Sequence, residues 1–457
     1  MNVEKFKSEG ISQLSYLVSS GNEAAVIDPR RDCQAYLDAA RRGGLKIRYI
    51  FETHRNEDFV VGSIELGKLT GAEIYHGPGL DWKYGNTLKD GQTFKIGKII
   101  LTALLTPGHT DESMCYTLAD MGTGQAVVGV FTGDTLFVNE VGRADLYGAS
   151  ETPRMASNLY DSIFGKLFSL GDGVIIYPAH GGGSVCGAHI ADRESSTIGI
   201  EKAQNPVLKL KTKEDFIKFK VGEKLERPFY FRQMEKYNLE GPLILPRLPA
   251  PVPLTSAEFK AAAEQGALVI DTREPSSFGG LHIKGAYNIW VDGLPAFSGW
   301  ILPYDKPLLL VLEDPNYLEK AVSFLYRAGY DNITGYLRGG MDDWSNTGMP
   351  MQSLSMLPVH ELKQAIDSHE DLFLLDSRSE MEWEAGHIDN AYHIFVGFID
   401  KRLAEIPKEK PVAVYCSTGH RSSIAVSILL RAGYKHVLNV PGSITAWKAA
   451  GFPVVKS

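Results

Sequence analysis

The chain has 457 residues, of which 44% are hydrophobic and 22% charged, and at about 150 residues a domain it is long enough for about three folded domains. Its formal net charge of −8 argues against a basic surface for nucleic acid or anionic lipid, so neither partner is expected. The first residues, MNVEKFKSEG, are charged where a signal peptide is apolar, and no run approaches the roughly 18 apolar residues of a spanning helix. A cytoplasmic protein is therefore expected.

Residues 1 to about 235 alternate short apolar runs with helical segments such as RRDCQAYLDAARRGG. The apolar runs end in Asp, His or Thr beside Gly or Pro, and they read EAAVIDP, IRYIFETH, IILTALLTPGH, AVVGVFTGD and GVIIYPAH. Runs of this kind indicate strands. This part of the chain therefore predicts a layered α/β domain whose polar residues gather at one rim.

Four cysteines are spread widely along the chain, at Cys33, Cys115, Cys186 and Cys416. Such spacing predicts free thiols in a reducing compartment rather than a disulfide framework. Cys33 and Cys115 fall within an apparent helix and an apparent strand, so we expect them to be core residues.

A proline-rich segment, LEGPLILPRLPAPVPLT, closes the first domain near residue 245, because this density of proline forbids helix and favours an extended connector. Beyond it the chain repeats itself, and VIDTREPSSFGGLHIKGAYNI aligns with LLDSRSEMEWEAGHIDNAYHI at an offset of 105 residues. An offset of this size indicates two copies of one small domain rather than a solenoid. The predicted domains are therefore residues 1–245, 254–350 and 355–457.

The last copy carries a reactive-site pattern in PVAVYCSTGHRSSIAVSILLRAGY, where a buried strand leads through a loop into an amphipathic helix. Cys416 begins the loop and Arg421 closes it. A helix N-terminus and successive backbone N–H groups stabilise an anion, so the sulfur of Cys416 is expected to react as a thiolate. The residues between would surround that sulfur with hydrogen-bond donors: Ser417, Thr418, Gly419 and His420.

These residues resemble the rhodanese sulfurtransferases over about 100 residues, a span typical of one small domain. The resemblance rests on the loop from Cys416 to Arg421, the DSR at 376–378, the GHI at 386–388 and the late Trp447. It implies that the cysteine accepts a sulfane sulfur and hands it to a nucleophile. Three polar residues are expected to hold the fold rather than react: Asp376, Arg378 and His387.

The first copy resembles the same family but lacks its reactive groups. Alignment from RAGY places Leu312 opposite Cys416 and Tyr317 opposite Arg421, so that LEDPNY replaces CSTGHR. Neither a nucleophile nor an anion donor remains in that loop. We therefore predict that the first copy has no transferase activity and serves as a spacer or a docking surface.

The amino-terminal domain offers one candidate metal ligand after each of three predicted strands. His54 follows RYIFET, His109 follows LLTPG, and Asp134 follows VVGVFTG. Because the strand ends are expected to share a rim, they would supply two imidazoles and one carboxylate. That donor set, with positions left open, is the facial triad that favours non-haem Fe(II).

The same segment resembles the metallo-β-lactamase superfamily over about 230 residues, which implies an αββα sandwich. Hydrolases of that superfamily usually carry His-x-His-x-Asp-His and bind two metals, but Asn56 and Phe59 take two of the histidine positions here. Because Phe cannot ligate and Asn is a poor zinc donor, the second metal site is expected to be lost. The remainder is similar to the persulfide dioxygenase branch, in which one iron is held by the residues matching His54, His109 and Asp134.

The resemblance implies further roles around that iron. Arg143 in VGRADL matches a position beside the substrate channel, where a guanidinium would orient an anionic thiol. Tyr177 would donate a hydrogen bond near the iron, and His180 would line the pocket because its partner site is lost. Cys186 would either relay sulfur or simply pack.

The order of the three modules resembles the persulfide dioxygenase and sulfurtransferase fusions of bacterial sulfide detoxification. This resemblance implies one Fe(II) per chain, a dimer or tetramer, and a low-molecular-weight thiol persulfide, dioxygen, sulfite and thiosulfate as partners. Persulfide would be oxidised to sulfite, and Cys416 would transfer sulfane sulfur to form thiosulfate. The thiol carrier stays open. The alternatives are a zinc-dependent thioester hydrolase of the glyoxalase II type and a sulfur-sensing scaffold with a vestigial metal site.

Overall fold

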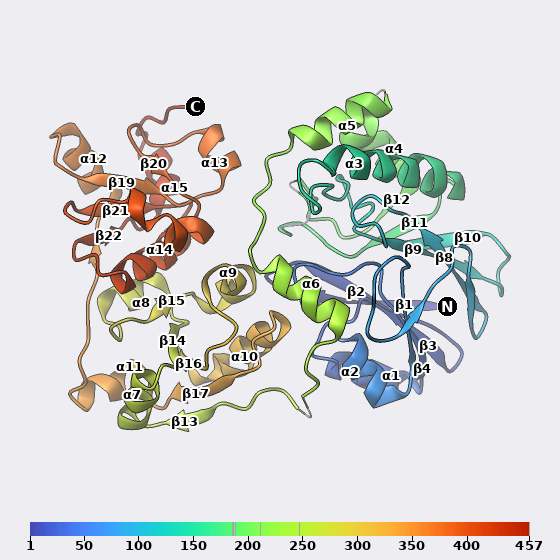
Figure 1. Ribbon diagram of the computed structural model, residues 1–457, viewed down its shortest axis with the longest axis horizontal. Helices are drawn as coiled ribbons and strands as arrows, with labels where there is room; N and C mark the ends of the chain where they lie inside the picture. Colours follow the sequence, from blue (N-terminus) through green and yellow to red (C-terminus); the bar gives the residue numbers. More distant parts are fainter. Residues whose placement is uncertain (185–186, 188, 211, 246, 457) are drawn as a thin grey trace. The chain divides into compact units, whose positions relative to one another are not determined.

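The computed structural model describes residues 1–184, 187, 189–210, 212–245 and 247–456, and the chain divides into two compact units, Met1–Pro246 and Arg247–Ser457 (Figure 1). Within these described residues the first unit contains two six-stranded sheets and the second two five-stranded sheets. The predicted fold class, an αββα sandwich followed by two smaller α/β domains, is confirmed.

The first sheet of the amino-terminal unit runs in the order β1-β2-β3-β4-β5-β6, antiparallel from β1 to β3 and parallel from β3 to β6. Its strands are β1 (Asn2–Ser8), β2 (Gln13–Ser20), β3 (Glu23–Ile27), β4 (Lys46–Phe51), β5 (Glu73–His76) and β6 (Asn86–Thr87). The second sheet runs β12-β11-β10-β9-β8-β7 and is antiparallel except between β10 and β11. Its strands are β7 (Thr93–Ile96), β8 (Ile99–Leu105), β9 (Met114–Asp120), β10 (Val127–Gly133), β11 (Ile175–Pro178) and β12 (Ser196–Thr197).

Aromatic side chains from both sheets fill the space between them. Tyr16 of β2 and Phe51 of β4 belong to one buried cluster with Tyr116 of β9 and Phe131 of β10. The rings of Phe51 and Tyr116 have their centroids 5.0 Å apart. Burying a side chain such as Phe51 contributes about 1.5–3 kcal/mol relative to leaving it exposed. This core fixes the two sheets against each other, and with them the strand ends that carry polar residues.

Amphipathic helices cover the outer face of each sheet. Tyr36 and Leu66, from α1 and α2, are buried against the first sheet, whereas Leu159 and Phe216, from α3 and α5, are buried against the second. The helices are α1 (Gln34–Gly43), α2 (Ser63–Thr70), α3 (Thr152–Tyr160), η1 (Asp161–Leu167), η2 (Phe168–Leu170), α4 (Ile198–Gln204), η3 (Val207–Lys209), α5 (Lys213–Gly222) and α6 (Phe231–Glu240).

The carboxyl-terminal unit contains two successive parallel sheets of the same topology. The first runs β13-β17-β16-β14-β15 and the second β18-β22-β21-β19-β20. The central strands β16 and β21 are buried at every residue, as expected for parallel strands covered on both faces. The strands are β13 (Val252–Leu254), β14 (Leu268–Asp271), β15 (Tyr287–Asn288), β16 (Leu308–Val311), β17 (Ile333–Leu337), β18 (Ser355–Met356), β19 (Phe373–Asp376), β20 (Tyr392–His393), β21 (Val412–Tyr415) and β22 (Val437–Asn439).

Helices connect these parallel strands. In the first half they are α7 (Ser256–Glu264), α8 (Pro275–Gly280), η4 (Val291–Gly293), α9 (Leu294–Ile301), η5 (Pro315–Tyr317), α10 (Leu318–Arg327) and α11 (Gly340–Asn346). In the second half they are α12 (Val359–Asp367), α13 (Glu380–Ala385), η6 (Val396–Lys401), η7 (Leu403–Glu405), α14 (His420–Arg431) and α15 (Ser443–Ala449).

Equivalent side chains make equivalent contacts in the two halves, which confirms the internal repeat. Arg378 donates twice to Asp376, and the first half repeats this ion pair at 271–273. Trp344 and Trp447 are both buried, and each indole N–H donates to a backbone carbonyl six residues further on. Asp376 and Arg378 therefore hold the fold, as expected.

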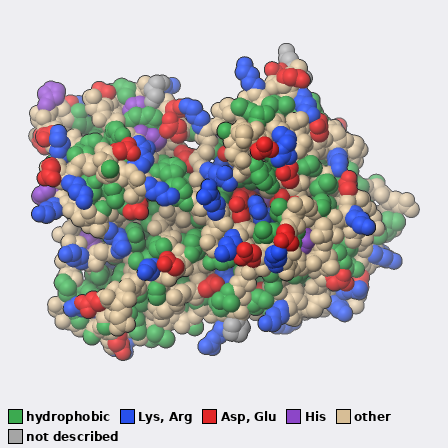
Figure 2. All heavy atoms as spheres, in the orientation of Figure 1, with side chains coloured by type: hydrophobic (Ala, Val, Ile, Leu, Met, Phe, Trp, Pro, Cys, Tyr) green, Lys and Arg blue, Asp and Glu red, His purple; other side chains and the backbone are tan. Residues whose placement is uncertain are grey.

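The surface and the helices bear on two expectations drawn from composition. On the face shown in Figure 2, Lys and Arg side chains are interspersed with Asp and Glu, in keeping with the net charge of −8. Among the described residues, every helix is too short or too polar to cross a bilayer.

Candidate metal centre and sulfur-transfer site

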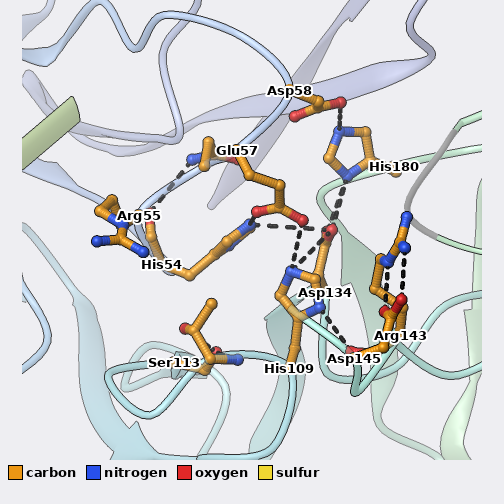
Figure 3. A network of polar contacts seen from close by, with 12 residues as sticks. His54, Arg55, Glu57, Asp58, His109, Ser113, Asp134, Arg143, Asp145 and His180 are labelled. Carbon is orange, nitrogen blue, oxygen red and sulfur yellow. Dashed lines mark hydrogen bonds and ion pairs between the residues drawn. The ribbon is translucent and has the colours of Figure 1, made fainter. Parts of the chain in front are cut away.

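Four polar side chains meet at one rim of the amino-terminal sandwich (Figure 3). His54 follows β4, His109 follows β8, Asp134 follows β10, and Glu57 lies in the turn after His54. One donor atom from each lies within 4.8 Å of the others, and all four side chains are buried. The structure brings together the three residues expected from the strand ends and adds a carboxylate that was not expected.

Hydrogen bonds behind the two imidazoles decide which ring nitrogen faces this group. A backbone carbonyl can only accept, so the Nδ1–H of His109 donates to the Arg143 oxygen, 3.0 Å away. The Thr53 hydroxyl donates to Asp28 and accepts from Nδ1–H of His54 at 2.9 Å. Both Nε2 atoms therefore face Asp134, at 3.8 Å from His54 and 3.6 Å from His109. Such a supporting layer of bonds is what orients histidine ligands around a metal.

The charges around the group favour a cation at its centre. Burial lowers the pKa of His54 in spite of the nearby Asp134 carboxylate. Burial acts in the same direction on His109, but Glu57 at 3.1 Å and Asp134 outweigh it and raise the pKa of His109 to about 9. The histidines lower the pKa of Glu57 to about 2 against the effect of burial.

The donor set fits a divalent metal ion. Glu57 and Asp134 are both held in the ionised form, and an ion between them would supply the positive charge that otherwise sits on an imidazole. The buried Nε2 of His54 makes no hydrogen bond within the described part of the chain, so a metal would also satisfy this atom. Two imidazoles and a carboxylate suit iron, and a second carboxylate leaves zinc possible.

Asp58, Phe59 and His180 line the neighbouring position, where the loss of a second metal stays a prediction. His180 lies between two carboxylates, with Nδ1 2.8 Å from Asp134 and Nε2 3.0 Å from Asp58. The Phe59 ring stands edge-on to His180, with centroids 6.2 Å apart. Asn238 of α6 donates to two backbone carbonyls of this turn, each at 2.7 Å, and so holds it against the helix. His180 therefore adjoins the metal group through their shared Asp134.

Arg143 and Tyr177 make their main contacts away from the four-residue group. The Arg143 guanidinium is buried and donates twice to Asp145 at 2.7 Å, and this pair lowers the pKa of Asp145 against the effect of burial. Its backbone oxygen, rather than its side chain, reaches the metal group through His109. The Tyr177 ring stacks on Phe131, with centroids 5.0 Å apart, in the core between the sheets. The substrate-binding roles of both side chains stay predictions.

The cysteines of the first unit give no second reactive centre within the described residues. Cys33 and Cys115 are buried, and burial raises the pKa of both thiols, to about 11 for Cys115. The Cys115 sulfur lies 3.2 Å from the Thr106 hydroxyl. Both are core residues, as expected. Cys186, the candidate relay, lies outside the described residues.

Cys416 lies at the end of β21, where the loop leads into α14. Its side chain is 1% exposed, and its sulfur accepts from the backbone N–H of Gly419 at 3.1 Å. The positive φ of 109° at Gly419 is a conformation that other residues rarely adopt, and it lies where the chain enters α14. The N–H group and the helix N-terminus together stabilise negative charge on the sulfur.

Arg421 closes the loop and is clamped by a carboxylate. Its guanidinium makes a bidentate pair with Glu382 of α13, at 2.6 and 2.7 Å. Burial alone would raise the pKa of Glu382, but Arg421 outweighs it and lowers the pKa to about 2. Ser417 donates to the same carboxylate at 3.2 Å. Glu382 thus fixes both the second and the last residue of the reactive loop.

The other polar side chains of the loop lie at its outer edge. Thr418 Oγ1 is 3.1 Å from Nδ1 of His420, and Nε2 of His420 is 3.1 Å from a carboxylate oxygen of Glu274. His387 makes its contacts with α13, where its Nδ1–H donates to the Trp383 carbonyl at 3.1 Å. Its ring also stacks on the Trp383 indole, which agrees with the structural role expected for it.

The corresponding loop of the first half holds neither a thiol nor a guanidinium. Leu312 follows β16 where the cysteine follows β21, and Tyr317 ends the loop with its side chain exposed. Ser277 takes the place of Glu382 in the repeat and donates to Glu313 of this loop at 3.0 Å. The first half thus lacks the nucleophile, the guanidinium and the carboxylate that would clamp it.

Sequence reasoning missed Glu57 and Glu382. Glu57 stands at a spacer position of the His-x-His-x-Asp-His pattern, which gave no reason to inspect it. Glu382 is 39 residues from Arg421, too far for a local pattern to join them. The repeat itself held a signal, because Ser277 replaces Glu382 in the copy that also lacks the loop arginine.

Comparisons with known proteins bear on both sites. Residues 9–180 match the metallo-beta-lactamase superfamily, and residues 255–347 and 358–450 each match the rhodanese-like domain. The mitochondrial persulfide dioxygenase ETHE1 of Bos taurus is 30% identical over 223 residues, covering 45% of this chain and 73% of that protein. A sulfurtransferase of Allochromatium vinosum is 39% identical over 94 residues, covering 21% of this chain and 88% of that protein. A metallo-beta-lactamase structure from Staphylococcus aureus covers 74% of this chain and 98% of its own, at 31% identity and a TM-score of 0.66.

Proposed function

From the premise that the chain belongs to the metallo-beta-lactamase superfamily in its amino-terminal region and to the rhodanese-like family in its two carboxyl-terminal domains, we propose a paired sulfur chemistry. The amino-terminal domain, residues 1–245, oxidises the terminal sulfur of a low-molecular-weight thiol persulfide with dioxygen. The last domain, residues 355–457, transfers sulfane sulfur, and residues 254–350 form an inactive rhodanese-like domain. The products are thiol, sulfite and thiosulfate, a set that would detoxify sulfide.

The oxidative half rests on the donor set of His54, His109 and Asp134, and on Phe59, which lies beside His180 and cannot ligate a second ion. A hydrolase of this fold usually uses two metals, whereas one ion with open positions suits dioxygen chemistry. We assign one Fe(II) per chain to these residues. When bound, it supplies the one-electron steps that let dioxygen react with a closed-shell sulfur compound.

The chain's own residues orient this chemistry. Thr53 and the Arg143 carbonyl keep each imidazole in the tautomer whose Nε2 faces Asp134 and would bind the metal. Burial of the group excludes bulk water, which strengthens the field of Glu57 and Asp134. The overall oxidation balances as R–S–SH + O2 + H2O → R–SH + SO3²⁻ + 2 H⁺, so sulfur is oxidised while dioxygen is reduced.

The transfer half rests on Cys416. Its thiolate attacks the terminal sulfur of a persulfide and releases the thiol, which leaves a cysteine persulfide in the loop. That sulfur then passes to sulfite as Cys–S–S⁻ + SO3²⁻ → Cys–S⁻ + S2O3²⁻. The Gly419 N–H stabilises the thiolate that leaves, and Arg421 keeps a positive charge beside the loop.

Product balance tests the proposal. Iron-loaded protein given glutathione persulfide should consume one dioxygen for each sulfite or thiosulfate formed, with thiosulfate appearing as sulfite accumulates. Hydrolysis of a glutathione thioester without oxygen uptake would instead favour the zinc hydrolase, and loaded protein inert to both substrates would favour a scaffold. Rates compared across persulfides of glutathione, coenzyme A, bacillithiol and cysteine would identify the carrier.

Glu57→Gln is expected to weaken metal binding about 10–100-fold, because it removes an ionised carboxylate from the wall of the site. Chelator competition under anaerobic conditions measures this directly. Glu52→Gln is the matched control, since the buried Glu52 carboxyl accepts from Tyr84 at 2.9 Å and lies outside the metal group. Equal metal affinity in both variants would show that Glu57 does not act on the metal.

Glu382→Gln is expected to lower the stability of the last domain at neutral pH but not at pH 2. The folded-state pKa of Glu382, about 2, lies below the usual carboxyl value of about 4.3. The ion pair with Arg421 therefore stabilises the fold above that usual value and loses its contribution as the pH falls toward 2. Unfolding temperatures of the variant and of the unsubstituted protein at pH 7, 4 and 2.5 measure this loss of stability. A difference in unfolding temperature that does not shrink as the pH falls would contradict the prediction.

A further inference from the structure

Residues of the inactive first half lie on the reactive loop of the second. Glu274 directly precedes α8, and its carboxylate is 3.1 Å from Nε2 of His420, the first residue of α14. Trp290, from the same half, packs against the His420 ring with centroids 4.7 Å apart. The first half therefore contacts the reactive loop of the second half, the loop that carries Cys416.

Further contacts between the two halves hold Glu274 in place beside α14. Ser423, within the first turn of α14, donates to Asn288 at 2.5 Å, and both side chains are buried. Asn288 in turn donates to the carbonyl of Arg273, the neighbour of Glu274. Trp300 of the first half lies so close to Gly397 of the second that a Cβ there would be 2.2 Å from the ring. These contacts hold the backbone around Glu274 against α14.

Two hydrogen bonds of the His420 ring connect Glu274 of the first half to Thr418 of the loop. A carboxylate only accepts, so Nε2 of His420 carries a proton and donates to Glu274. Nδ1 of the same ring is then left to bond the Thr418 hydroxyl at 3.1 Å. Thr418 is two residues from Cys416, and Ser417 and Arg421 are already committed to Glu382. Since His420 donates to Glu274, the Thr418 hydroxyl is the loop side-chain donor that is not paired with a carboxylate and can turn toward an incoming anion.

We infer that Glu274 and Trp290 are positioning residues of the sulfur-transfer site, and that through His420 they hold the Thr418 hydroxyl where sulfite binds to the persulfide of Cys416. This inference rests on the proposed transfer function. It makes the first half a part of the active site rather than a spacer. The His420 and Glu274 side chains are 36% and 55% exposed, so their pair contributes little to folding and its loss should act on sulfite binding.

Glu274→Gln in the full-length protein is expected to raise the KM for sulfite about three- to tenfold with kcat changed less than about twofold, because the charge-assisted bond to His420 is weakened. Asp292→Asn is the matched control. It removes an ion pair of similar exposure, with Lys320, inside the first half, and the sulfite KM should stay unchanged.

A double-mutant cycle tests whether Glu274 acts through His420. The variant with both Glu274→Gln and His420→Asn should have the sulfite KM of His420→Asn alone. An unchanged KM in Glu274→Gln, or two effects that multiply in the double variant, would overturn the inference. Mass spectrometry of persulfide on Cys416 keeps the two proposals apart. No loading of the unsubstituted protein refutes the transfer function, whereas normal loading with an unchanged KM refutes only the positioning role.

Discussion

Cys416→Ser is expected to abolish thiosulfate formation while persulfide-dependent oxygen uptake and sulfite release stay within about twofold of the unsubstituted protein. A serine hydroxyl is not ionised in this loop and cannot carry a sulfane sulfur, so transfer should fall at least about a hundredfold. The metal group is built entirely from residues of the other unit, which is why the oxidation should persist. An oxygen electrode and chromatography of sulfite and thiosulfate measure both activities in one incubation.

The same variant tests the first half. Its loop offers Leu312 and Tyr317 where the second offers a thiol and a guanidinium, so no transfer should remain once Cys416 is replaced. Thiosulfate formation at more than about a tenth of the normal rate would contradict both the assignment of Cys416 and the inactivity of the first half.

His109→Gln is expected to remove bound iron and to lower oxygen uptake at least about a hundredfold, since it deletes one of the three proposed metal ligands. The imidazole of His109 is held by the Arg143 carbonyl on one side and faces Glu57 and Asp134 on the other, an arrangement that an amide cannot reproduce. Iron content by elemental analysis and oxygen uptake after anaerobic iron loading give the two readouts.

Sulfur transfer is the internal control for this variant. Cys416 and its clamp lie in the other unit, so His109→Gln should still convert persulfide and added sulfite to thiosulfate at the normal rate. Retention of iron and of oxygen uptake would show that His109 is not a ligand. Loss of both activities together would point to general unfolding rather than to a metal site.

The fold could be predicted from the sequence because its signals are local or repeated. Short apolar runs that end in Asp, His or Thr mark strands whose ends share a rim, and His54, His109 and Asp134 do meet there. The second half repeats the first at a nearly constant offset, so the fold predicted for one half applies to the other. The buried Asp376 and Arg378 pair was also foreseeable, since its two residues lie in one short motif.

The sequence does not show which way a side chain points or which residues far apart in the chain come into contact. The Arg143 guanidinium donates to Asp145, and the direction of this side chain depends on packing that the sequence VGRADL does not show. Tyr177 lies on a strand, where a neighbouring register would face the opposite side of the sheet. The contact between Glu274 and His420 joins residues 146 positions apart, which only the packed halves bring together.

The metal content of protein purified without oxygen tests the central claim most directly. We expect iron near one per chain, and we expect dioxygen uptake on addition of persulfide to scale with that iron. Two zinc ions per chain, with uptake that does not respond to iron loading, would contradict the account.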